Sequence, residues 1–135
     1  MNYKIKPKPL ILRLFTKPFQ TVAFYPNIYT PDGTAPAKAV LEHELKHLEQ
    51  QLDMGKWRFI YKYFTSKKFQ FEMEVEGIAV ELLHTPHDGR MRLAQNYAKL
   101  LASDAYSHCA PSYDAALVAI CKAVGPDAGI AISNS

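Results

Sequence analysis

The stretch PAKAVLEHELKHLEQQLDM, residues 36–54, constrains the fold more than any other part of the chain. Its leucines recur at the i, i+4, i+7 and i+11 positions that share one face of an α-helix: Leu41, Leu45, Leu48 and Leu52. Gly55 follows directly and suits the position just after a helix end. We therefore expect a helix over residues 36–54 with its leucine face turned to the core.

The same helix carries the segment His43-Glu44-Leu45-Lys46-His47. A spacing of four residues puts the two imidazoles about 40° apart around the helix axis, so both nitrogens can reach one zinc ion. Glu44 lies about 60° from His47, close enough to take a proton from a water that zinc has acidified. This pattern predicts a metal site with His43 and His47 as ligands and Glu44 as general base. The alternative is a solvated helix face with incidental histidines.

A catalytic zinc site needs a third protein ligand, and the acidic stretch at residues 71–82 is the obvious source. Its apolar side chains share one helical face: Phe71, Val75, Ile78 and Leu82. Glu72 and Glu76 lie on one flank of that face and Glu74 lies on the other. Helix geometry alone does not choose between the flanks.

A resemblance to a known family favours one of these glutamates as the third ligand. His43-Glu44-x-x-His47 followed by a glutamate on a later helix resembles the gluzincin class of zinc metallopeptidases. Glu72-x-Glu74-Val75 is similar to the pattern E-x-E-A-x-x-F-A-x-x-L-L of bacterial and phage peptidases, and Gln50 resembles the H-E-x-x-H-x-x-Q form of small phage and bacterial metallopeptidases. The resemblance covers residues 36–86. It implies zinc held by His43, His47 and Glu72, with Glu76 as second choice, and Glu74 as third through the register E-x-E-G.

The remaining residues predict an α+β fold in one domain, 1–135. Strand-forming residues at 21–25 and 27–30 indicate a small antiparallel sheet with Pro26 at an edge or bulge. Residues 10–15 suit a strand or a helical turn. Helical segments are expected at 68–83, 90–106 and 111–125 and a helix or turn at 57–64, with Ser112 as an N-cap and a loose tail from Pro126. The resemblance implies a minimal zincin-like layout of this sheet and helical body.

The composition limits the classes of partner that we expect this protein to bind. Apolar residues make up 48% of the 135 residues and charged residues 21%, as in a globular protein. The net charge of +3 comes without a nucleic-acid-binding motif, and no stretch is long enough to span a membrane, so neither nucleic acid nor membrane is expected as a partner. No signal peptide is recognised, so the expected location is the cytoplasm or a virion. Two cysteines, Cys109 and Cys121, do not predict a disulfide framework.

These observations lead to two functional hypotheses. The first is a zinc metallopeptidase that hydrolyses a protein or the peptides of peptidoglycan, holding an extended substrate at the sheet edge near residues 22–30. The second is a phage virion or tail component, bound to other virion proteins, in which a bracing or inactive zinc site remains.

Overall fold

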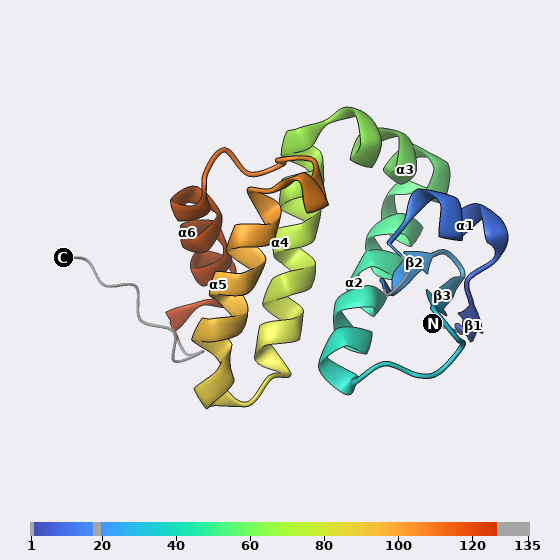
Figure 1. Cartoon of the computed structure of the whole chain (residues 1–135), viewed down its shortest axis with the longest axis horizontal. Helices are drawn as coiled ribbons and strands as arrows, with labels where there is room; N and C mark the ends of the chain where they lie inside the picture. Colours follow the sequence, from blue (N-terminus) through green and yellow to red (C-terminus); the bar gives the residue numbers. More distant parts are fainter. Residues whose placement is uncertain (1, 18–19, 127–135) are drawn as a thin grey trace.

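The computed structural model describes residues 2–17 and 20–126 and places a small sheet beside a stack of helices (Figure 1). The main elements in chain order are β1 (Ile5–Pro7), α1 (Leu10–Phe15), β2 (Val22–Phe24), β3 (Asn27–Thr30), α2 (Lys38–Met54), α3 (Lys56–Thr65), α4 (Lys67–Leu83), α5 (Arg90–Leu101) and α6 (Tyr113–Val124). Two short 3₁₀ helices, η1 (His87–Gly89) and η2 (Asp104–Tyr106), flank α5.

The sheet has the strand order β1-β3-β2. β3 pairs antiparallel with β2, and the two are joined by a turn at Tyr25 and Pro26. β1 pairs parallel with β3, with Ile5 opposite Ile28. Helix α1 leads the chain from the β1 edge to the β2 edge, so the hairpin turn returns β3 into the centre. The sheet is therefore mixed.

This topology corrects the predicted fold class. We predicted the antiparallel sheet of a minimal zincin-like metallopeptidase domain. This prediction is wrong, because residues 5–7 form a third strand that runs parallel to its neighbour. Alternation and turn signals reveal a hairpin, but they say nothing about a strand added from a distant segment. The chain is mainly helical with a small mixed sheet, which fits the α+β class only in a broad sense. Residues 10–15 form a helix, and Pro26 lies in the hairpin turn.

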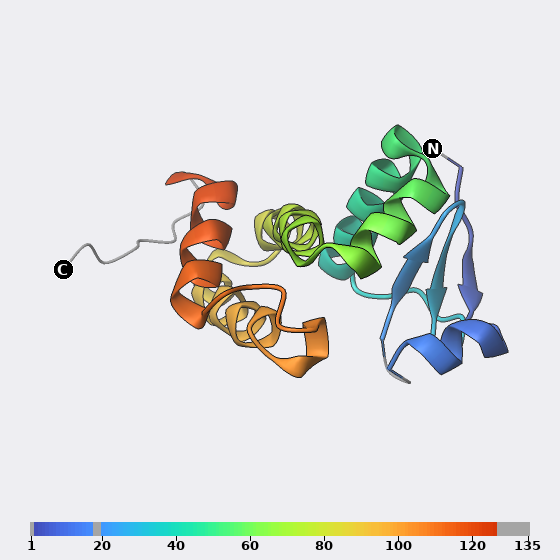
Figure 2. The same cartoon turned by 90° about the horizontal axis from the view of Figure 1, so that it is seen from above.

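Four layers follow one another across the molecule: the sheet, then α2 with α3, then α4, then α5 with α6 (Figure 2). The main hydrophobic core lies between α4, α5 and α6. Its fully buried members are Ile78, Leu82, Ala94, Ala98, Leu101, Ala116 and Ile120. Helix α4 thus presents its apolar face to α5 and α6 and its opposite side to α2. This central position makes α4 the element on which the site depends.

Helix α2 buries a different face from the one that the leucines predict. Of the four leucines of that stripe, Leu48 is fully buried and Leu52 is 52% exposed. The buried polar side chains of this helix are His43, Glu44, His47, Gln50 and Gln51. Because α2 lies between the sheet and α4, its histidine face is enclosed by a second helix rather than left to solvent.

The other predicted helices form with adjusted ends. Ser112 caps α6 by accepting a hydrogen bond from the Ala115 amide, as predicted, and Gly55 ends α2 with a φ of 96°. The segment expected at 90–106 breaks after Leu101 and resumes as η2. The tail expected to be loose lies outside the described residues from 127 on. Among the described residues, no helix is both long and apolar enough to cross a membrane.

Candidate metal centre

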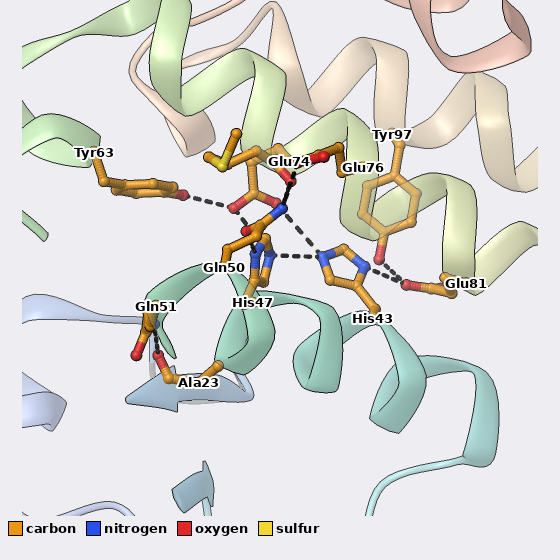
Figure 3. A network of polar contacts seen from close by, with 11 residues as sticks. Ala23, His43, His47, Gln50, Gln51, Tyr63, Glu74, Glu76, Glu81 and Tyr97 are labelled. Atoms are coloured by element: carbon orange, nitrogen blue, oxygen red, sulfur yellow. Dashed lines mark hydrogen bonds and ion pairs between the residues drawn. The ribbon is translucent and has the colours of Figure 1, made fainter. Parts of the chain in front are cut away.

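Two imidazoles on α2 face each other at the centre of the molecule (Figure 3). The Nε2 atoms of His43 and His47 are 3.1 Å apart, as expected for side chains one helical turn apart. Two unprotonated ring nitrogens at this distance repel each other unless a proton or a cation lies between them. The pair therefore needs either a shared proton or a bound cation between the rings.

Glu74 of α4 completes a group of three metal-type ligands with these histidines. Its Oε2 lies 3.5 Å from His43 Nε2, and its Oε1 lies 3.4 Å from His47 Nε2. Ligands around a tetrahedral zinc ion, each about 2.0–2.2 Å from the metal, stand roughly 3.3–3.5 Å apart. The observed distances of 3.1, 3.4 and 3.5 Å are close to that spacing, with a different oxygen of Glu74 facing each histidine. Two histidines and one glutamate also form a donor set found in catalytic zinc sites.

The structure brings Glu74, and not Glu72, to the two histidines. Glu72 and Glu76 lie exposed on α4, outside this group, whereas Glu74 is buried. The flank of α4 that turns toward α2 is the Glu74 flank, because the apolar face is committed to α5 and α6. The first and second choices for the third ligand are thus replaced by the third choice.

His43 is oriented by a chain of partners from α4 and α5. Its Nδ1 lies 2.8 Å from Glu81 Oε1, and the Tyr97 hydroxyl donates to the same oxygen at 2.6 Å. A histidine that gives its second N–H to a carboxylate keeps the other nitrogen free for a metal. Glu81 therefore holds the imidazole of His43 with Nε2 toward His47 and Glu74.

Gln50 orients the imidazole of His47 in the same way. Its Oε1 lies 2.8 Å from His47 Nδ1, and because that oxygen only accepts, the ring nitrogen donates. The Gln50 amide nitrogen donates to Glu76 Oε2 at 2.9 Å and to the Met73 carbonyl at 3.2 Å. The glutamine singled out in the sequence thus links an imidazole of α2 to α4, and Glu76 supports it instead of binding metal.

Gly77 keeps the space in front of the histidines open. A Cβ atom at this position would lie 2.8 Å from both Cδ2 and Nε2 of His43, and 3.2 Å from Cε1 of His47. Only a residue without a side chain leaves these rings in place at such a close helix–helix approach. The methyl group would lie against Nε2 of His43, one of the three candidate ligand atoms.

Glu44 stands apart from these contacts. It is 9% exposed, and no described residue donates a hydrogen bond to its carboxylate. Burial raises the pKa of the Glu44 carboxyl. The negative charges of Glu74 and Glu81 raise this pKa further, whereas the charges of His43 and His47 lower it without cancelling the rise. A buried carboxylate without a protein donor and with a raised pKa suits a general base.

The cluster contains more acidic groups than basic ones: three carboxylates, those of Glu44, Glu74 and Glu81, and two imidazoles, those of His43 and His47. Burial disfavours charged histidines, but hydrogen bonds to Glu74 and Glu81 outweigh it and raise the pKa of His43 to about 10. The pKa of Glu74 is lowered despite its burial, chiefly by the charge of His47 and the hydrogen bonds of both histidines. Buried carboxylates in excess of cations favour a bound divalent ion.

Several site residues escape sequence analysis. Glu81, Tyr97 and Gly77 contact the metal-binding side chains, and Tyr63 of α3 donates to Glu74 Oε1 at 2.8 Å. One signal for them exists in the sequence: Glu74, Gly77 and Glu81 follow the i, i+3, i+7 spacing of one helix face. The tyrosines carry no comparable signal, because they come from separate helices.

The proposed substrate-binding edge is occupied by the protein itself. β3 is the central strand, so only β2 of the predicted hairpin has a free side. There, Gln51 of α2 donates to the Ala23 carbonyl at 2.9 Å (Figure 3). The same side chain accepts a hydrogen bond from the Tyr25 amide at 2.7 Å. Strand addition at residues 22–25 would have to displace this side chain.

Both cysteines are free and buried, so no disulfide links them. Burial raises the pKa of the Cys109 thiol to about 11. His84 and His108 are exposed and bond to nearby backbone carbonyls, and they take no part in the metal centre.

No family model, curated protein or solved structure matches this chain.

Proposed function

We propose that this protein is a zinc-dependent metallopeptidase in which His43, His47 and Glu74 hold the metal and Glu44 is the general base. The single observation that carries the proposal is the convergence of these three ligands at 3.1–3.5 Å beside a buried carboxylate without a protein donor. The H-E-x-x-H segment and the ligand set of two histidines and a glutamate are those of the gluzincin class, which supports a hydrolytic role.

The chemistry divides between the metal and the chain. A zinc ion bound by this set lowers the pKa of water to about 7 and polarises a carbonyl group. Glu44 accepts the proton of the attacking water and later delivers it to the amide nitrogen of the leaving group, so the carboxylate ends the cycle as it began. Glu81 and Gln50 hold the two imidazoles in the tautomer that leaves Nε2 free.

The test is Glu44→Gln in the full chain, assayed for zinc content and for hydrolysis. We expect zinc to be retained and cleavage to fall by about 10²–10⁴-fold, because loss of a general base removes that much rate. Glu42→Gln, another glutamate on α2 and outside the cluster, is the matched control and should cleave like wild type. Cleavage by Glu44→Gln at the wild-type rate would show that the proposed mechanism is wrong.

The substrate class within this proposal is a protein or the peptide stems of peptidoglycan, acted on in the cytoplasm or in a virion. Incubation of the zinc-loaded protein with casein and with purified peptidoglycan separates the two. New amino termini in one substrate and not the other assign the class.

A second function is favoured by the burial of the centre. The four key side chains are only 4–9% exposed, and they join α2 on the sheet side of the molecule to α4 on the other. A metal in such a position can brace the fold, as in a virion or tail component bound to other virion proteins. Stoichiometric zinc that resists chelation, with no cleavage of either substrate, would favour bracing over hydrolysis.

A further inference from the structure

Helix α3 exposes a line of aromatic rings. Trp57, Tyr61 and Phe64 are 70%, 70% and 73% exposed. Their i, i+4, i+7 spacing places them within about 60° on one side of the helix. The opposite side is committed to the interior, where Phe59 is buried and Tyr63 bonds to Glu74. Exposed aromatic side chains of this size, gathered on one helix face, are typical of an interaction surface rather than of chance exposure.

The segment of the chain that carries this aromatic face is basic. Between Asp53 and Glu72 the chain has no acidic residue and five basic ones, Lys56, Arg58, Lys62, Lys67 and Lys68. Arg58 and Lys62 fall on one flank of α3, about 90° and 130° from the centre of the aromatic line, and Lys62 Nζ lies over the Phe69 ring. Lys56 is engaged, since its Nζ donates to the Tyr25 carbonyl at 3.0 Å, whereas Arg58, Lys67 and Lys68 are exposed. We therefore expect a partner of this face to carry negative charge.

We propose that the aromatic face of α3 is a docking surface for an anionic phospholipid bilayer. Tryptophan and tyrosine favour the boundary between headgroups and acyl chains, and lysine and arginine beside them reach the lipid phosphates. α3 is a surface helix, so its exposed side can lie in that boundary while Phe59 stays in the core (Figure 2). The expectation of no membrane partner rested on span length, and surface docking needs no span.

A second copy of the chain is a poorer occupant. A two-fold contact through this face would bring Arg58, Lys67 and Lys68 of one copy against those of the other. Single-stranded nucleic acid also binds surfaces that combine aromatic and basic side chains. A lipid bilayer fits this face better, because Trp57, Tyr61 and Phe64 lie together on the open side of one helix, as in helices that bind at a membrane surface. Both alternatives are outcomes of the test.

The experiment uses Trp57 as its own reporter, since the chain has one tryptophan. The full chain is titrated with phosphatidylcholine vesicles and with vesicles containing phosphatidylglycerol. We expect the emission of Trp57 to shift to the blue and the protein to co-sediment with the anionic vesicles, at least tenfold more tightly than with neutral ones. Each basic residue near an anionic surface strengthens binding roughly fivefold, so Arg58→Glu with Lys68→Glu should weaken binding by more than tenfold.

Matched variants separate this surface from general stickiness. Tyr61→Ser with Phe64→Ser keeps the reporter and should weaken vesicle binding at least tenfold without changing the melting temperature. Leu83→Ser with Leu100→Ser removes two other exposed apolar side chains, 52% and 40% exposed, and should leave binding unchanged. Lys99→Glu with Lys122→Glu makes the same charge change elsewhere on the surface and should weaken binding by no more than about twofold.

Three results would overturn the proposal. The first is equal binding to neutral and anionic vesicles, or none to either. The second is tighter binding of a poly-dT oligonucleotide, which displaces the protein from vesicles and assigns the face to nucleic acid. The third is a concentration-dependent dimer that Tyr61→Ser with Phe64→Ser dissociates. None of these readouts depends on the metal centre.

Discussion

Each imidazole of the metal centre has one nitrogen committed to the protein and one left free. Glu81 Oε1 accepts a hydrogen bond from Nδ1 of His43, and Gln50 Oε1 accepts one from Nδ1 of His47, at 2.8 Å in each case. These contacts fix both rings with Nε2 directed toward the other histidine and Glu74. Because the two Nε2 atoms are 3.1 Å apart, either a proton or a metal ion has to lie between them, and the hydrogen bonds to Glu74 and Glu81 favour a proton on His43 by raising its pKa to about 10.

Glu74 is the residue whose role is most directly testable. Glu74→Gln removes the negative charge opposite both Nε2 atoms, and we expect zinc affinity to fall at least hundredfold, measured by competition with a chromophoric chelator. Glu72→Gln on the same helix is the matched control and should change affinity by no more than about twofold, because Glu72 is exposed outside the cluster. The opposite ranking would return the ligand to the position that the family pattern favours.

Gly77 offers a steric test of the same centre. The methyl group of Gly77→Ala would lie 2.8 Å from His43, so either the ring or α4 must shift. We expect weakened zinc binding and a loss of about 1–3 kcal/mol in the free energy of unfolding, although alanine favours a helix. For comparison, the added Cβ in Gly89→Ala meets nothing closer than 3.8 Å, and its stability should stay within about 0.5 kcal/mol of wild type. Normal zinc binding by Gly77→Ala would refute the close approach.

At the scale of elements, α4 has two faces with different tasks. Val75, Ile78 and Leu82 join α5 and α6 in the hydrophobic core. The stripe of Glu74, Gly77 and Glu81 faces α2 and provides a ligand, free space and a support for His43. Because the core holds the apolar face, it also sets the rotation of α4 that points Glu74 at the histidines.

Two neighbouring glutamines of α2 should separate the metal centre from the fold. Gln50 links His47 to α4, and Gln51 links α2 to the β2 edge. We expect Gln50→Ala to lower zinc affinity by about 10–100-fold, the usual effect of losing a partner of a ligating histidine. Gln51→Ala should destabilise the protein by about 1–3 kcal/mol, since the Ala23 carbonyl and the Tyr25 amide lose their partner, with little change in zinc affinity. Equal effects of the two changes on zinc binding would argue against this division.

At the scale of the whole molecule, the centre lies where the sheet side of the chain meets the helical core. α2 packs on β2 and β3, while α4 packs on α5 and α6, and the metal-binding side chains join the two helices (Figure 1). A metal ion bound there would stabilise a long-range contact that is otherwise made through buried polar groups. Its removal would therefore lower the stability of the whole chain.

Removal of a bound metal should therefore change the melting temperature of the whole chain. With free zinc at a thousand times its dissociation constant, binding adds about 4 kcal/mol to the free energy of unfolding. For a chain of 135 residues this corresponds to a rise in melting temperature of roughly 10–20 °C over the metal-free protein, measured by calorimetry with zinc and with a chelator. Glu74→Gln serves as the control, because its melting temperature should respond weakly to zinc. Identical melting curves for wild-type protein with and without zinc would mean that the centre binds no metal under these conditions.

Local pattern was enough to predict α2, α4, α6 and most of α5, the helix ends at Ser112 and Gly55, and the proximity of His43 and His47, because these depend on neighbours within one or two helical turns. It left α1 open between a strand and a helical turn and α3 open between a helix and a turn, and it missed the break after Leu101. Three features depend on long-range packing: the parallel addition of β1, the enclosure of the histidine face of α2, and the choice of Glu74 over Glu72. Each is set by how one element rotates and docks against another that is distant in sequence. The spacing of residues within a helix carries no record of that rotation, so only the tertiary structure decides which flank of α4 meets the histidines.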